Sequence, residues 1–432
     1  MEGMSRVAVV GSGVAGLGAA WAMSREHRVV VYEAEARLGG HAHTVEIDEP
    51  AGPLPVDTGF IVYNAANYPN LVQLFNHLDV ATEPTDMSFG VSLSQGRFEY
   101  QARALGLLAQ PSNLARPSYL RMVADILRFA RTAPTAQLDP TMSTRAFLDA
   151  AGYSVAFRRD FLLPILACIW SSSLEAMLEY PARSMIGFLN NHGLLDVLHR
   201  PSWRTVTGGS REYVRRITAP IRADARLATP VVAVLRDDDG VRVVDSRGGI
   251  DVFDDVVFAT HADTTLQILG GAATDEERRV LSAFTYQRNA VVLHRDPALL
   301  PRRERVWSSW NYLSDERPGH ERERVSLSYW MNRLQNLETE RPVIVTVNPA
   351  REPRWVASEH VYHHPQYDGH AADAQAEIPS LQGVQRTWFA GSYCGYGFHE
   401  DALRSGLEVA AALGAPAPWW PTGTRELVGA AR

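Results

Sequence analysis

Residues 6–33, RVAVVGSGVAGLGAAWAMSREHRVVVYE, decide the fold that we expect of this chain. Residues 6–10 form a short apolar run that ends at a glycine, as expected of a buried parallel strand. The small side chains of residues 15–23 predict a helix, and residues 28–33 predict a second buried strand that ends in Glu33. A strand, a glycine turn, a helix, a strand and an acid in this order predict a dinucleotide-binding unit.

Each glycine of the turn has a physical task in such a unit. We expect Gly11 to allow the tight turn, Gly13 to let a diphosphate approach the backbone, and Gly16 to let the helix pack closely on the strand. The helix N-terminus offers free N–H groups and a partial positive charge to the phosphates. Glu33 lies 22 residues after Gly11, where it can accept hydrogen bonds from a ribose.

A second glycine pair bears on the choice between FAD and NAD. Shortly after Glu33 the chain reads Arg37-Leu38-Gly39-Gly40, which resembles the RxGG signature that follows the dinucleotide fold in FAD-dependent amine oxidases and their relatives. The resemblance implies that the backbone approaches a longer cofactor and that Arg37 lies toward its phosphates. The sequence therefore favours FAD over NAD.

The composition excludes several classes of protein. A chain of 432 residues suggests about two domains, and a net charge of −7 argues against a general nucleic-acid binder. The two cysteines, Cys168 and Cys394, fit a reducing compartment without disulfides. All 42 basic residues are arginines, so mechanisms that need a lysine base or a Schiff base are excluded.

We expect a cytoplasmic protein. A strand is predicted almost at the start of the chain, so no secretory signal peptide is expected. The apolar run 161–170 contains Pro164 and is shorter than the about 20 residues of a membrane span. Residues 118–131 predict an amphipathic helix with Arg121, Asp125 and Arg128 on its polar, outer face. This face is either solvated or a peripheral contact with the inner face of the membrane. Such a contact would involve nearby leucines and the arginines Arg116, Arg121, Arg128 and Arg131.

The rest of the chain predicts helices and a second set of strands. Residues 56–78 predict a loop followed by a helix, and residues 86–204 are predicted to be mainly helical. Asp239-Gly240 predicts a hairpin turn, and residues 255–260 predict another buried strand. Several strands within residues 286–379 predict a second sheet.

Four pieces of the sequence together resemble the flavin amine oxidase, phytoene desaturase and protoporphyrinogen oxidase superfamily. They are the dinucleotide unit, RLGG (37–40), DDVVFATHA (254–262) and the segment 387–413. More narrowly, four segments are similar to the branch of FAD-dependent oxidoreductases associated with cyclopropane-fatty-acyl synthases. These are VDTGFIVYN (56–64), TGGSREYV (207–214), SYWMNRLQ (328–335) and GYGFHEDALRSGL (395–407).

This resemblance implies the architecture of the chain. We expect an α/β fold with a Rossmann-type FAD-binding domain and a second, substrate-binding domain of mixed sheet and helices. Residues 1–85, 205–285 and 380–415 are assigned to the FAD-binding domain, and residues 86–204 and 286–379 to the substrate domain. Residues 416–432 are expected to form a docked C-terminal extension.

The resemblance also implies an activity, the desaturation of a fatty acyl or modified fatty acyl lipid by hydride transfer to FAD. A small-amine oxidase, a flavin-dependent isomerase and a non-catalytic partner of a lipid methyltransferase or cyclopropane-fatty-acyl synthase stay open as alternatives. Many amine oxidases of the superfamily place a lysine near the flavin, and this chain has none. The amine-oxidase mechanism is therefore in doubt here.

His399 and His41 are the candidate catalytic residues, because the segments that carry them are expected to flank the flavin. Each is either a proton carrier or a structural histidine. Residues 400–413 predict a helix whose N-terminus would face the electron-rich end of the flavin. Glu400 and Asp401 are either ordinary N-terminal acids or flavin contacts. The expected cofactor contacts are Gly11, Ser12, Gly13, Ala15, Gly16, Glu33, Ala34, Arg37, Gly39, Gly40, His41, Val232, Gly391, Ser392, Gly397, Phe398, His399 and Ala402.

Three further features are open to two interpretations. The segment HVYHH (360–364) contains histidines, but without another ligand cluster nearby we expect no metal site. Cys394 is either a small buried side chain or a covalent link to flavin, and the first is favoured. An apolar substrate tunnel or a plain core would contain residues 161–178 with Trp310, Tyr312, Tyr329, Trp330 and Met331.

Overall fold

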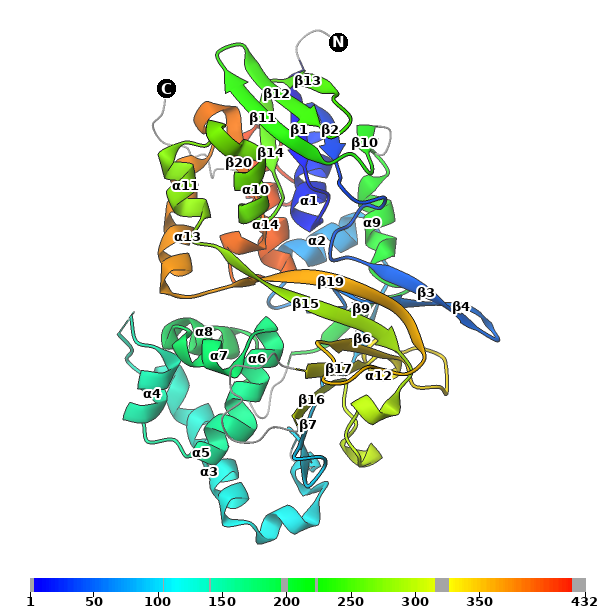
Figure 1. Cartoon of the computed structure of the whole chain (residues 1–432), viewed down its shortest axis with the longest axis vertical. Helices are drawn as coiled ribbons and strands as arrows, with labels where there is room; N and C mark the ends of the chain where they lie inside the picture. Colours follow the sequence, from blue (N-terminus) through cyan, green and yellow to red (C-terminus); the bar gives the residue numbers. More distant parts are fainter. Residues whose placement is uncertain are drawn as a thin grey trace.

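A computed structural model describes residues 4–103, 105–139, 141–195, 201–221, 224–314 and 326–421. A five-stranded sheet and a seven-stranded sheet organise the chain, with helices packed around them (Figure 1). In Figure 1 the five-stranded sheet lies in the upper part of the molecule. The long strands β15 (Thr285–His294) and β19 (Val356–Gln366) cross the middle of the molecule below it.

The five-stranded sheet contains the strands predicted at residues 6–10, 28–33 and 255–260, which are thereby confirmed. Its order is β10-β2-β1-β14-β20, and all neighbouring strands are parallel. Both faces of such a sheet are covered, which is why these strands read as continuous apolar runs. Their bounds are β1 (Arg6–Val10), β2 (Arg28–Tyr32), β10 (Ala225–Arg226), β14 (Asp255–Phe258) and β20 (Thr387–Phe389).

Two helices pack tightly against each other beside this sheet. They are α1 (Val14–Met23), which is buried throughout, and α14 (His399–Ala412), which confirms the helix predicted near the end of the chain. A Cβ added to Gly406 would lie 2.1 Å from the backbone oxygen of Ala15. Glycine at this position therefore lets the two backbones touch and fixes α14 against the glycine turn that precedes α1.

A small antiparallel sheet adjoins the five-stranded one. It consists of β11 (Val231–Asp237), β12 (Gly240–Asp245) and β13 (Ile250–Phe253). The predicted hairpin is confirmed, but the prediction that Asp239-Gly240 forms its turn is wrong by one residue. Asp237 pairs with Gly240, so the turn residues are Asp238 and Asp239. The neighbouring helices are α10 (Ala262–Leu269), α11 (Asp275–Leu281) and α13 (Gly369–Leu381).

The seven-stranded sheet confirms the second sheet predicted within residues 286–379. Its order is β19-β15-β18-β17-β16-β7-β8, and β15 and β19 form a long antiparallel pair. The short helix α12 (Met331–Leu334) follows β17. The remaining strands are β7 (Phe89–Leu93), β8 (Phe98–Gln101), β16 (Trp310–Ser314), β17 (Ser326–Trp330) and β18 (Ile344–Val347).

The prediction that residues 86–204 are mainly helical is wrong at the start of this range. The strands β7 and β8 lie there, and β7 pairs in parallel with β16, which is more than two hundred residues away in the sequence. A short strand whose partner is so distant is stabilised by tertiary pairing, and its own sequence gives little sign of it.

The helical layer follows these two strands. It contains α3 (Pro117–Thr132), α4 (Thr144–Ala150), α5 (Val155–Phe157), α6 (Leu163–Trp170), α7 (Leu174–Glu179) and α8 (Ala182–Asn191). The helix predicted at residues 118–131 is confirmed as α3. Asp125, which we expected on its solvated face, is buried. Its carboxylate accepts a hydrogen bond from Ser154 N at 3.0 Å and pairs with Arg128 at 3.0 Å, which satisfies the buried charge.

Two small sheets and two helices connect the larger parts. The strands β3 (Thr44–Glu49) and β4 (Gly52–Asp57) form a hairpin, and β9 (Trp203–Val206) pairs with both β5 (Val62–Asn64) and β6 (Thr82–Thr85). The helices are α2 (Pro69–His77) and α9 (Arg211–Thr218). The loop expected from residue 56 thus contains the end of β4 and all of β5, whereas the helix expected after it is confirmed as α2.

The end of the described chain packs on the first helix. The indole ring of Trp419 stacks on that of Trp21 in α1, with ring centroids 5.6 Å apart. Residues 422–432, the rest of the expected C-terminal extension, lie outside the described residues. Within the described ranges, none of the helices combines the length and the apolar character that crossing a membrane would require. The boundaries that we assigned to the two domains stay a prediction.

Candidate active site

The glycine turn before α1 has an open position at its centre. A Cβ on Gly11 would lie 2.7 Å from Ala259 O, and one on Gly16 would lie 2.0 Å from Gly11 O, so both glycines serve the packing of β1, α1 and β14. A Cβ on Gly13 would meet no atom within 4 Å. The backbone of Gly13 is therefore accessible to a ligand, whereas its two neighbouring glycines are in close contact with protein.

The same turn contains the N-terminus of α1. Gly13 is the N-cap, no side chain among the described residues caps the helix, and no acid lies in its first turn. The free N–H groups and the helix dipole favour an anion at this point. Ser12 and Ala15, also expected to contact the cofactor, are buried, so only their backbone can take part.

Glu33 lies at the end of β2, beside the glycine turn. Its Oε2 accepts hydrogen bonds from Ser12 N at 2.9 Å and from Ser12 Oγ at 2.5 Å. Ala34, next in the chain, is exposed. The segment before β11 joins this end of β2, because Thr229 N donates to Glu33 O at 2.8 Å. Val232, the most distant expected contact in the sequence, lies three residues further and is 52% exposed.

The second glycine pair lies directly against the first turn. Gly39 N donates to Ser12 O at 3.0 Å, and a Cβ on Gly40 would lie 3.1 Å from the Cα of Gly13. Arg37 holds this turn by donating to Gly40 O at 2.8 Å and pairing with Glu35 at 3.0 Å. The structure thus brings together the two glycine motifs that are about 25 residues apart in the sequence.

The loop from Gly391 to Phe398 is held from both sides. Gly391 N donates to Ser405 Oγ at 2.9 Å, so α14 fixes the start of the loop. Tyr367 Oη donates to Ser392 O at 3.1 Å, and a Cβ on Gly397 would lie 2.9 Å from that hydroxyl. Sequence reasoning missed Tyr367, which lies more than twenty residues before the loop that it supports.

The two acids at the start of α14 cap helices. Asp401 Oδ2 accepts a hydrogen bond from Phe398 N at 3.0 Å within its own first turn. Glu400 accepts hydrogen bonds from the backbone N–H groups of Asn70 at 2.9 Å and Leu71 at 3.0 Å, at the start of α2. Of the two interpretations of these acids, the contacts favour the structural one. Ala402, an expected cofactor contact, is buried in the first turn of α14 behind them.

His399, the first residue of α14, is held by two aromatic side chains. Its ring stacks on Phe60 with centroids 3.8 Å apart and planes 9° apart, and its Nε2 lies 2.7 Å from the hydroxyl of Tyr213. Burial lowers the pKa of His399 to about 3, so the imidazole is neutral near pH 7. Sequence reasoning missed Phe60 and Tyr213, although both lie in segments that carry the family resemblance.

His41 has a buried ring nitrogen without a partner. Among the described residues no group hydrogen-bonds its Nε2, and burial together with neighbouring histidines lowers its pKa well below the usual range. Its ring lies 4.9 Å from that of Tyr362, centroid to centroid. The backbone oxygen of His41 accepts a hydrogen bond from Phe60 N at 2.8 Å. Phe60 therefore connects the two candidate histidines, through its backbone to His41 and through its ring to His399.

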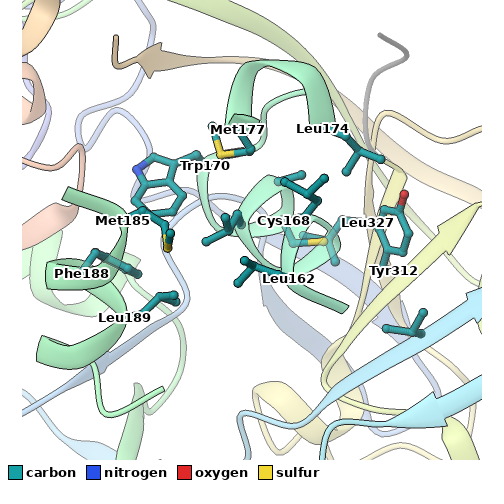
Figure 2. Close-up of a cluster of buried hydrophobic side chains, with 14 of the residues drawn as sticks. Leu162, Cys168, Trp170, Leu174, Met177, Met185, Phe188, Leu189, Tyr312 and Leu327 are labelled. Atoms are coloured by element: carbon teal, nitrogen blue, oxygen red, sulfur yellow. The ribbon is translucent and has the colours of Figure 1, made fainter. Parts of the chain in front are cut away.

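An aromatic group links the start of α14 to the helical layer. The ring of Phe398 stacks on Phe188 at 4.9 Å, and Phe188 lies 4.8 Å from Trp170. Figure 2 shows Trp170 and Phe188 within a cluster of buried side chains, which we call the apolar cluster. Its labelled members are Leu162, Cys168, Trp170, Leu174, Met177, Met185, Phe188, Leu189, Tyr312 and Leu327.

Most of the side chains expected to line a substrate tunnel belong to this cluster or pack on it. Tyr312 and Met331 are among its buried members, and Trp310 and Tyr329 pack against it. Trp330 was expected with them, but its ring packs against Trp307 at 5.4 Å. Successive side chains of a strand point to opposite faces of the sheet, so the side chain of Trp330 lies on the face opposite to that of Tyr329.

The remaining candidates carry little chemistry in this structure. Burial raises the pKa of the Cys394 thiol to about 12, which keeps it protonated and unreactive near neutral pH. Among the described residues, no group of three or more histidine, cysteine and acidic side chains could hold a metal ion.

Comparison with known proteins agrees with this arrangement. The family model for flavin-containing amine oxidoreductases matches residues 14–295. Among curated proteins, no sequence matches this chain significantly.

Similar solved structures cover nearly the whole chain. A provisionally assigned protoporphyrinogen oxidase from Exiguobacterium sp. 255-15 has a TM-score of 0.69 at 16% identity, covering 95% of this chain and 99% of its own. A CLA-producing fatty acid isomerase from P. acnes gives 0.66 at 16%, covering 94% and 98%. Cyclohexylamine oxidase from Brevibacterium oxydans IH-35A gives 0.67 at 17%, covering 95% and 99%. At these identities the similarity shows the fold.

Proposed function

The chain belongs to the flavin-containing amine oxidoreductase family and is a FAD-dependent oxidoreductase, and from this premise we propose that it desaturates a hydrophobic acyl lipid. In such a desaturation the substrate loses a hydride from one carbon and a proton from its neighbour, and the remaining electron pair forms the double bond. FAD, when bound, supplies the hydride acceptor, and the electrons pass on to dioxygen or another acceptor.

The residues of the site fit FAD. The diphosphate would be held at the backbone of Gly13 and the N-terminus of α1, where the position of a Cβ is open and no side chain caps the helix. Glu33 would accept hydrogen bonds from the ribose. The unpartnered Nε2 of His41 would find a polar partner on the cofactor, on water or on the substrate.

One observation carries the choice of an apolar substrate. The first turn of α14 contacts the apolar cluster directly, because Phe398 stacks on Phe188 and Phe188 packs on Trp170. Burial against such side chains is worth about 0.8 kcal/mol for each CH₂ group of a ligand. A long acyl chain that lay among these side chains would bury many CH₂ groups, whereas a small amine would bury few. The cluster would therefore bind and orient the chain and exclude water from the reacting carbons.

The chain has no lysine that could act at the flavin, so histidines are the candidate proton carriers. His399 is neutral and occupied by Phe60 and Tyr213, so it positions the first turn of α14. We propose His41, whose Nε2 has no hydrogen-bond partner among the described residues, as the carrier of the proton that the acyl chain loses.

The narrower resemblance described above supports a modified acyl chain and a partner. The segments at residues 56–64, 207–214, 328–335 and 395–407 are similar to the branch associated with cyclopropane-fatty-acyl synthases. We propose that the substrate carries a methyl branch or a cyclopropane ring. A lipid methyltransferase would then be the enzyme that supplies it.

Anaerobic reduction of the bound flavin tests the proposal. The holoenzyme is mixed in detergent micelles with an acyl ester or with an alkylamine of the same chain length, and loss of the visible flavin absorbance is recorded. Cyclohexylamine and putrescine serve as small-amine controls. We expect bleaching by the acyl ester and none by the amines.

The other outcomes separate the alternatives. Bleaching by amines alone would replace the acyl substrate with an amine. A shifted double bond in the product, with the flavin left oxidised, would indicate an isomerase, the activity named for one of the similar structures. If neither substrate bleaches the flavin, and a lipid methyltransferase keeps its full activity with the His399→Ala variant, the protein is a non-catalytic partner.

A further inference from the structure

The segment 102–138 exposes an unusual number of leucines. Leu105 is 84% exposed, and Leu108, Leu114, Leu120 and Leu127 are each between 45% and 51% exposed. In α3, Leu120 and Leu127 lie seven residues apart and therefore on the same side of the helix. Figure 1 shows α3 at the end of the molecule opposite to the β11–β13 sheet. We call these five leucines, together with Arg116, Arg121, Arg128 and Arg131, the leucine–arginine face; Arg103 is left out because it pairs with Asp86 at 2.5 Å.

The charge of this segment is opposite to that of the whole chain. Residues 102–138 contain five arginines and a single acid, Asp125, whereas the chain has a net charge of −7. Asp125 is buried and already paired with Arg128 and with Arg121, so it offers no negative charge to a partner. Arg116 lies over the ring of Phe98 and donates to Arg97 O, and no acid among the described residues pairs with it.

A face that combines exposed leucines with arginines is complementary to the surface of an anionic bilayer. Arginines attract anionic headgroups, and apolar side chains bury themselves at the boundary between headgroups and acyl chains. A second copy of this chain is disfavoured, because a symmetric contact would place arginines against arginines. Nucleic acid is disfavoured, because leucines gain nothing from a phosphate backbone. We propose that the leucine–arginine face binds peripherally to the surface of an anionic phospholipid bilayer.

The other side of α3 gives this contact a consequence. Tyr119, Met122 and Phe129 are buried and belong to the same set of packed side chains as the apolar cluster. The helix therefore separates the bilayer from the side chains that lead to Phe398. Membrane binding does not depend on the proposed substrate. If that substrate is an acyl lipid, the leucine–arginine face would bring the enzyme to the bilayer that contains it.

Co-sedimentation with vesicles tests the proposal on the full-length holoenzyme. Vesicles of phosphatidylcholine alone are compared with vesicles of phosphatidylcholine and phosphatidylglycerol in equal parts, at low and at high salt. We expect the protein to sediment with the anionic vesicles at low salt, and its binding to fall with added salt because the arginine contribution is screened. Equal binding to both vesicle types would overturn the proposal.

Two double variants separate the contributions of the face. Arg116→Glu with Arg131→Glu should weaken binding to anionic vesicles by more than about tenfold, because each arginine is attracted to the anionic headgroups and each glutamate is repelled by them. Leu120→Gln with Leu127→Gln should weaken it as well. The matched control is Ile250→Gln with Val252→Gln, two exposed apolar side chains of β13 that should leave binding unchanged.

Folding and self-association are controlled in the same samples. The flavin spectrum and the melting temperature of each variant show whether it is folded. Wild-type binding in both double variants would overturn the proposal. The proposal would also be overturned if the wild type self-associated but did not bind vesicles and the leucine variant lost this self-association. The face would then be assigned to a contact with a second copy. If vesicles bind but no acyl ester bleaches the flavin, the membrane contact stands and the proposed substrate fails.

Discussion

Gly13 lies at the N-terminus of α1, and the position that its Cβ would take has no atom within 4 Å. A side chain there would occupy the space proposed for the diphosphate without displacing protein. We predict that Gly13→Val weakens FAD binding by at least about tenfold, which corresponds to about 1.4 kcal/mol. Gly271→Val is the matched control, since a Cβ at Gly271 also meets nothing within 4 Å.

Titration of the apoprotein with FAD, together with thermal unfolding without FAD, checks this prediction. Both variants should unfold at temperatures close to that of the wild type. An unchanged FAD affinity in Gly13→Val would contradict the assigned position of the diphosphate. A loss of stability specific to Gly13→Val would show instead that the glycine is required for packing.

His399 makes the second prediction at the scale of a residue. Burial holds its pKa at about 3 in the folded protein, whereas an unfolded histidine titrates near pH 6.5. The unfolded state therefore binds more protons below pH 6.5. The stability that His399 contributes is fully present above about pH 6.5 and is lost as the pH falls toward about 3.

The variant His399→Phe keeps the stack on Phe60 but cannot titrate. We predict a free energy of unfolding that is lower by about 1–3 kcal/mol near pH 7, because the Tyr213 hydroxyl loses its partner. Between pH 6 and pH 4 the slope against pH should become shallower than in the wild type, by up to about 1.4 kcal/mol per pH unit. Urea unfolding at several pH values measures both effects, and an unchanged slope would contradict the buried neutral state of His399.

Residue roles could be predicted from the sequence where they depend on local spacing. The tasks of Gly11 and Gly16 follow from a motif of six residues, and both glycines have the close contacts expected of them. Phe60 and Tyr213 could not be placed, because their contacts with His399 join three separate parts of the chain. The roles of His399 and His41 in catalysis stay a prediction.

At the scale of an element, Glu400 joins two helices. It lies in the first turn of α14 and accepts hydrogen bonds from the N-terminus of α2. Loss of a cap costs about 1–2 kcal/mol. We predict that Glu400→Ala lowers the stability of the apoprotein by this amount and that Glu400→Gln, which keeps an acceptor, lowers it less.

Thermal unfolding of the two variants checks the prediction, with the exposed Glu26→Ala as the control. The control should lie within about 0.5 kcal/mol of the wild type. If Glu400→Ala matches the wild type in stability but loses FAD, the acid contacts the cofactor instead of capping α2.

Elements with a strong periodic pattern were predictable, and those that depend on distant partners were not. The helices α3 and α14 have apolar stripes at helical spacing, and β1, β2 and β14 are continuous apolar runs. The strands β7 and β8 were missed because β7 pairs with β16, far along the chain. Asp125 was misplaced for a related reason, since its partner Ser154 lies outside α3.

At the scale of the whole molecule, α14 contacts α1 through Gly406 and, through Phe398 at its N-terminus, the helical layer. The glycine motifs meet beside the five-stranded sheet, and Phe398 contacts the helical layer. The presence of both sheets was predicted because each has its own set of apolar strands. The contacts of Phe398 with Phe188 and of Phe188 with Trp170 were not predicted, because they join the residue before α14 to α8 and α6.

The dependence of flavin reduction on acyl chain length tests the central claim, that an apolar acyl chain is oxidised by the FAD of this protein. The apparent second-order rate constant for anaerobic bleaching is measured with a series of acyl esters that differ by one CH₂ group. If the apolar cluster binds the chain, each added group should raise the rate constant by up to about fourfold, the equivalent of 0.8 kcal/mol, until the site is filled. A rate constant that does not change with chain length, or bleaching by short amines alone, would contradict the account.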